Sequence, residues 1–222
     1  MRKTILAIAL MLNGCASVPS AQALERHFSC LEDSKRLEAR SKELAEIVKA
    51  DQDERHNWQS KTPEEMMKVA DNDVSRRKRV GEIFGEGCFS KAEDYAAAAL
   101  VYQHGDAPDH FYQTFIWSRR GVELGDKSQE RMMALGIDRY LVNIGQRQLF
   151  GSQATKPNES KCWCLQRIEK SFPDKRRSEI AGKSLAQALD WLKELNAGQI
   201  CPISECDADL KPTPRGSVPG FW

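Results

Sequence analysis

The chain has 222 residues, seven cysteines and 33 basic against 32 acidic residues, which gives a formal net charge of +1. This length fits a single domain with its own hydrophobic core. The near balance of charge argues against a nucleic-acid-binding protein, which usually carries a basic excess. Charged residues make up 29% of the chain and the mean hydropathy is −0.57, so a protein with many membrane spans is excluded.

Residues 1–14 have the pattern of a secretory signal peptide. The chain begins MRKTILAIALMLNGC, in which two basic residues precede an apolar run that is too short to span a bilayer. The ending Leu-Asn-Gly-Cys resembles the Leu-x-Gly/Ala-Cys box of bacterial lipoproteins. That resemblance implies cleavage before Cys15, acylation of Cys15 and, since Ala16 and Ser17 follow, a periplasm-facing position on the outer membrane. Plain secretion is the alternative.

Apolar residues at helical spacing predict the body of the domain, after a lipidated tether over residues 15–23. Thr62 and Glu65, three residues apart, have the form of a capping box at the start of one helix. Ser90 and Glu93 have the same form at the start of the next helix. The periodicity predicts helices over 24–53, 63–84, 92–103, 108–124, 128–143, 161–171 and 178–196.

No stretch of the chain shows the sustained alternation of a β-strand. A polar loop is expected over 146–160, and the Pro- and Gly-rich residues 207–222 are expected to form a flexible tail. We therefore predict an all-α fold, a compact array of about six to seven helices without a substantial sheet. Its helical periplasmic domain covers residues 24–206.

The odd number of cysteines becomes even once Cys15 is assigned to the lipid. An even count in an oxidising compartment indicates disulfides, and six cysteines allow 15 connectivities. A bridge between residues i and i+2 is strained. This strain argues against a bridge between Cys162 and Cys164. We expect one bridge between Cys30 and Cys88. The other two are expected to join a Cys-x-Cys motif to the C-terminal pair in an order that stays open, and these four residues are Cys162, Cys164, Cys201 and Cys206.

Three motifs in the middle of the chain together resemble a family of bacterial proteins of unknown function. The motifs are Asp-Gln-x-x-Arg at 51–55, Gln-His-Gly at 103–105, and Asp-Arg at 138–139 followed by Gly-x-x-Gln-x-Phe-Gly-Ser-Gln at 145–153. Ser152 replaces the threonine of the family pattern and keeps the hydroxyl. The resemblance covers about residues 44 to 154. It implies a helical fold and no particular reaction.

The same residues are candidates for a polar network that joins two helices to the 146–153 loop. Adjacent residues of a helix lie about 100° apart, so Asp138 and Arg139 cannot both face the core and one needs a partner. In a hydrolase-like site, His104 would be the acid or base, Asp138 its orienter and Arg139 an anion clamp. The same network could instead hold the loop in place. The candidate binding residues are Gln103, His104, Asp138, Arg139, Gln148, Ser152 and Gln153.

We expect neither a metal ion nor a cofactor. His104, Asp106 and His110 have the chemistry of metal ligands, but Pro108 and Asp109 are also typical of a helix start. The predicted function is a noncatalytic binding or envelope-interaction module, with the hydrolase-like enzyme as the alternative. Expected partners are the membrane, through the lipid, and an envelope protein or a small ligand. Nucleic acid is not expected.

Overall fold

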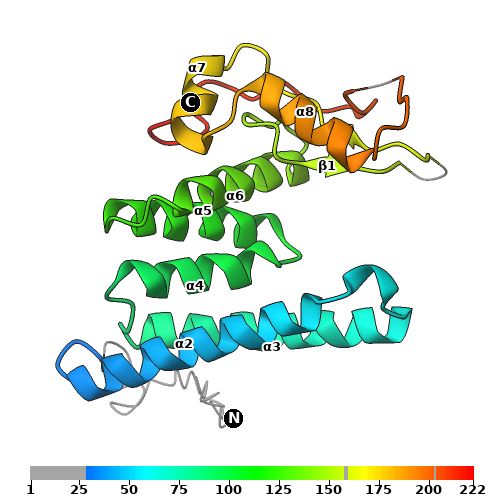
Figure 1. Ribbon diagram of the computed structural model, residues 1–222. Coiled ribbons are helices and arrows are strands. Elements are labelled where there is room, and N and C mark those ends of the chain that lie inside the picture. The colour runs from blue at the N-terminus through cyan, green and yellow to red at the C-terminus, as the bar shows by residue number, and fades with distance from the viewer. Residues whose placement is uncertain (1–28, 158–159, 203) are drawn as a thin grey trace, which may run out of the picture.

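The computed structural model describes residues 29–157, 160–202 and 204–222, and this part of the chain is mainly helical (Figure 1). The all-α prediction is confirmed, because the described strands form only one antiparallel pair of two-residue strands. The predicted signal peptide, Cys15 and the tether lie outside the described residues. The elements are α2 (Ser34–Arg55), a short 3-10 helix (Trp58–Ser60), α3 (Pro63–Gly85), α4 (Ala92–Gln103), α5 (Pro108–Glu123), α6 (Gln129–Asn143), β1 (Ala154–Thr155), β2 (Cys164–Leu165), α7 (Asp174–Ala181) and α8 (Leu185–Leu195).

Side chains cap several of these helices. The predicted box at the start of α3 is present: the Thr62 hydroxyl accepts from the Glu65 amide, and the Glu65 carboxylate accepts from the Thr62 amide. At α4 the predicted pair is wrong by one residue. Asp94, and not Glu93, accepts from the amides of Ser90 and Lys91, which satisfies donors that the helix leaves unpaired.

Three predicted helices differ from the structure. The first begins at Ser34, because the Asp33 side chain caps it there. Residues 161–171 are not helical: β2 pairs with β1, and the amide and carbonyl of Leu165 also bind the chain near Cys206. Local periodicity could not show these contacts between distant segments. The predicted 178–196 helix is divided at Gly182, which has a positive φ of 66° and ends α7.

The helices follow one another in space much as they do in sequence (Figure 1). The α2–α3 hairpin lies at one end, α4 packs beside it, α5 and α6 form the next pair, and α7 and α8 lie at the far end. Gly136 lets α5 and α6 approach closely, since an added Cβ would lie 2.9 Å from the backbone nitrogen of Phe115. The core has three clusters along this axis, which include Ile83, Ile137 and Leu165 respectively.

Three disulfides connect the expected cysteines. Cys30 pairs with Cys88 and so joins the segment before α2 to the residues after α3. The other two disulfides join Cys162 to Cys201 and Cys164 to Cys206. The structure thus gives the pairing of these four cysteines, which the sequence left open.

The C-terminal residues pack against the domain, which differs from the predicted flexible tail. Val218 is fully buried, and Phe221 and Trp222 pack against the same core cluster as Phe115. The Trp222 indole donates to the Thr213 carbonyl at 3.0 Å. The Pro- and Gly-rich composition predicts looseness, but these apolar side chains supply enough contact to hold the segment.

Among the described residues, no helix is long and apolar enough to cross a membrane.

Candidate functional site

Asp138 holds the loop that follows α6. Its side chain is fully buried. The carboxylate accepts from the amides of Leu149 at 2.8 Å, Phe150 at 3.0 Å and Ser152 at 2.9 Å, and from the Ser152 hydroxyl at 2.9 Å. Burial raises the pKa of Asp138, while these donors act in the opposite direction. Both oxygens are therefore occupied by the loop, and the residue folds that loop onto α6.

Gln148 closes the same loop from inside. Its side-chain amide donates to the carbonyls of Gln153, at 3.0 Å, and Gln166, at 2.7 Å, while its side-chain oxygen accepts from the Gln153 amide at 2.8 Å. The residue is fully buried. Gln148 thus fixes residues 148–153 and joins them to the segment after β2.

Arg139 joins three segments, as the sequence predicts. Its guanidinium donates to the Gln153 side-chain oxygen at 3.2 Å and to the Gln103 carbonyl at 2.7 Å, and lies 5.4 Å from the centroid of the Phe111 ring. Burial lowers the pKa of Arg139. The network that joins α4, α6 and the loop is therefore present, and its bonds hold these elements together.

His104 does not belong to the Asp138 cluster. Its Nδ1 lies 3.1 Å from a carboxylate oxygen of Asp51, a fully buried residue of α2. Arg55 binds the same carboxylate at 2.8 Å and reaches Asp73 of α3 at 2.7 Å. The predicted pairing of His104 with Asp138 is therefore wrong. The Asp51–Arg55 motif marked Asp51 as a residue of interest in the sequence. That Asp51 is the partner of His104 becomes visible only in the packing of α2 beside α4.

Among the described residues, the histidines and aspartates near the start of α5 do not gather into a group of three potential metal ligands. Pro108 occupies the first turn of α5 as expected, and His110 pairs with Asp106 at 3.1 Å. Within the described chain, the only group of three or more such side chains at ligand distance consists of Cys30, Glu86 and Cys88. Two of these form a disulfide, so their sulfurs are not available as thiolates.

Two carboxyl groups of α2, that of the buried Asp51 and that of the half-buried Glu43, have lowered pKa values. For Asp51, desolvation raises the pKa, but the hydrogen bond and charge of His104, together with Arg55, lower it further than burial raises it. For Glu43, the hydrogen bond from Arg79 is the main cause of the lowered pKa. Both groups are thus more acidic in the folded chain than in the unfolded chain.

The lowered pKa values predict that acid destabilises the fold. The unfolded chain binds more protons, so stabilisation is complete above the ordinary values of 3.8 and 4.5 and is lost as the pH falls through the folded pKa values. Urea midpoints are expected to be constant between about pH 7 and pH 5 and to fall below about pH 4.5. The raised pKa of Asp138 changes stability with pH in the opposite direction. The Glu43→Gln variant therefore serves as the specific control, because it removes only the contribution of Glu43 and should lose less stability in acid than the wild type. Midpoints that rise on acidification would contradict the prediction.

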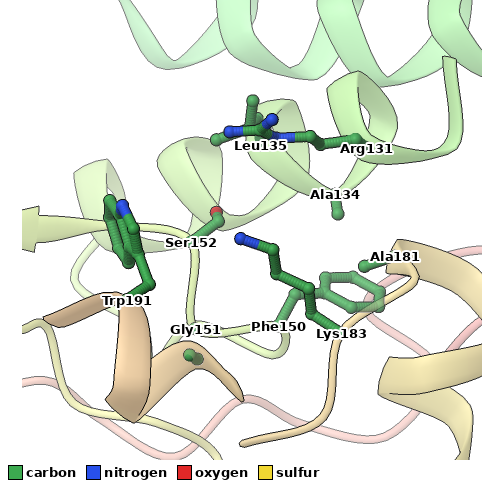
Figure 2. A pocket seen from close by; sticks show the side chains of 10 residues that line it. Arg131, Ala134, Leu135, Phe150, Gly151, Ser152, Ala181, Lys183 and Trp191 are labelled. Carbon is green, nitrogen blue, oxygen red and sulfur yellow. The ribbon is translucent and has the colours of Figure 1, made fainter. Parts of the chain in front are cut away.

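A pocket of about 60 Å³ opens beside the loop that Asp138 holds. Figure 2 shows α6 on one side, the Phe150–Ser152 loop beneath, and α8 with the turn before it on the other side. Gly151 lies in the floor with a φ of +76°, and an added Cβ there would lie 3.1 Å from the Cβ of Ala188. The lining residues are Arg131, Ala134, Leu135, Phe150, Gly151, Ser152, Ala181, Lys183, Ala188 and Trp191.

This pocket contains one of the predicted binding residues, Ser152, and depends on two others. Asp138 and Gln148 fix the loop that carries Ser152. Arg131, Lys183 and Trp191 were missed, because nothing in the local pattern of α6 or α8 shows that these two helices face each other. The two helices come together only because the segment between them, which carries Cys162 and Cys164, folds back so that α8 lies beside α6.

No protein-family model matches the chain, and no curated protein or solved structure matches it either. The functional conclusion therefore depends on the residues and their geometry.

Proposed function

We propose that the protein is a lipoprotein of the bacterial outer membrane whose periplasmic domain binds a ligand or an envelope partner without catalysing a reaction. The Leu-Asn-Gly-Cys box at residues 12–15 supports the lipid anchor. The three disulfides support an oxidising compartment such as the periplasm. The anchor would keep the domain at the membrane surface, where it meets other envelope components.

The observation that carries the binding role is the pocket beside Ser152, built on a loop that is already fixed. Because Asp138 and Gln148 satisfy the loop's polar groups, the pocket needs little rearrangement to accept a ligand. The hydrolase alternative needs Asp138 to orient His104. The oxygens of Asp138 instead bind the loop, and His104 pairs with Asp51. The geometry therefore favours binding over catalysis.

The anchor is tested by mass spectrometry of the mature N-terminal peptide. The wild-type peptide is expected to begin at Cys15 and to carry a diacylglycerol thioether and an amide-linked acyl chain. Cys15→Ser is expected to carry no lipid, because serine lacks the thiol that forms the thioether. Ser17→Ala, two residues away, serves as the control and is expected to be processed like the wild type. A wild-type chain cleaved elsewhere, or an acylated Cys15→Ser chain, would contradict the proposal.

A further inference from the structure

The inner surface of the pocket beside Ser152 is mostly apolar. Ala134 and Leu135 of α6, Ala188 and Trp191 of α8, and Phe150 of the loop all line it. A cavity needs about 10–15 Å³ of such volume to hold one water molecule, so the 60 Å³ pocket has room for a short aliphatic group of a few carbons. An apolar group there would replace water that finds few hydrogen-bonding partners.

Two cationic side chains extend over this apolar surface from different walls. Arg131 comes from α6, and Lys183 comes from the turn between α7 and α8 (Figure 2). Neither forms an ion pair with any carboxylate of the described chain. Lys183 lies 5.9 Å from the centroid of the Trp191 ring, which keeps its ammonium group near the pocket.

No acidic residue balances these charges among the described residues that line the pocket. The nearest carboxylate in the loop's network is that of Asp138, which is fully buried and covered by the amides and hydroxyl that bind it. The Ser152 hydroxyl is also engaged, since it donates to Asp138 and accepts from the Gln153 side-chain amide. The two cations are therefore the charged groups left to bind a ligand, and they favour a negative charge.

We infer that this pocket binds an aliphatic carboxylate, with its short hydrocarbon part between Ala134, Ala188 and Trp191 and its carboxylate between Arg131 and Lys183. The inference rests on the proposed binding function and names its ligand class. A guanidinium offers paired donors that match a carboxylate, and an ammonium adds a second charge. An amine would meet two like charges. A bare inorganic anion would leave the apolar surface uncovered.

The test uses butyrate as the probe, titrated into the detergent-solubilised full protein and followed by the NMR signal of the Trp191 indole N–H. Butyrate is expected to bind saturably with a millimolar dissociation constant, as its few atoms allow. Butylamine and inorganic phosphate are expected to bind at least about tenfold more weakly. Equal binding of either one would overturn the inference.

Charge-removing variants identify the site. Arg131→Met and Lys183→Met keep most of the aliphatic stem and are each expected to weaken butyrate binding about tenfold. Lys193→Met is the matched control, because Lys193 lies on α8 but pairs with Asp190 away from the pocket lining, and it should bind like the wild type. Unchanged affinity in both pocket variants, or no saturable binding, would overturn the inference. Because the N-terminal mass is measured separately, such a failure would leave the lipid anchor standing.

Discussion

Replacing Asp138 with alanine is expected to lower the free energy of unfolding by about 3–5 kcal/mol. The buried carboxylate accepts from the amides of Leu149, Phe150 and Ser152. Alanine would leave these donors without an acceptor where water has little access, and each unsatisfied buried donor costs about 1–3 kcal/mol. Loss of a buried charge offsets part of that cost. Urea denaturation followed by circular dichroism measures the change, and the melting temperature should fall by about 10 °C.

Two further variants make this prediction specific. Asp138→Asn keeps one acceptor oxygen, so its loss should be smaller than that of alanine. Asp71→Ala removes an exposed aspartate of α3 and should change stability by no more than about 0.5 kcal/mol. If the Asp138→Ala variant unfolds at the same urea concentration as the wild type, the carboxylate does not hold the loop. The argument that the pocket is pre-formed would then fail.

Removing the Cys30–Cys88 bridge by replacing both cysteines with alanine is expected to cost about 4 kcal/mol. The bridge spans a sequence separation of 58 residues, and opening it gives the unfolded chain more conformations. Both cysteines are buried and belong, with Val80 and Ile83, to the core cluster between the helical hairpin and α4. The lost sulfur contacts add to the entropic cost. Guanidinium denaturation of the oxidised wild type and the double variant gives the difference.

The Cys162–Cys201 bridge provides a comparison at similar loop length. It spans 39 residues, so chain entropy alone predicts nearly the same loss, about 4 kcal/mol. However, the neighbouring Ile200 is 99% exposed, and the surrounding coil can loosen locally without global unfolding. The double alanine variant at this bridge is therefore expected to lose less. A smaller loss at Cys30–Cys88 than at Cys162–Cys201 would contradict this account of the core.

The helical body of the protein could be predicted because its signals are local. The spacing of apolar residues and the Thr62–Glu65 box place α3 to within a residue, and Pro108 marks the start of α5. The segment after β1 could not be predicted in the same way. Its conformation depends on backbone bonds between Leu165 and residues about 40 positions later, and such bonds leave no periodic pattern.

The candidate site was predicted only in part for the same reason. The bonds of Arg139 to Gln103 and Gln153 agree with the expected network. The partner of His104 is Asp51, which lies 53 residues away in sequence, and the spacing of polar residues cannot choose between two buried aspartates. The pocket could not be predicted either, because Arg131 and Lys183 lie near each other only after the chain has folded α8 against α6 (Figure 2).

The most direct test of the central claim, that the loop held by Asp138 forms the floor of a binding pocket, is an intermolecular nuclear Overhauser measurement on the wild-type protein with butyrate. The probe's methyl and methylene protons are expected to show contacts with the Ala134 and Ala188 methyl groups and with the Trp191 ring, because these side chains line the pocket. Contacts confined to other residues, such as Trp163 beside the C-terminal disulfides, would contradict the claim.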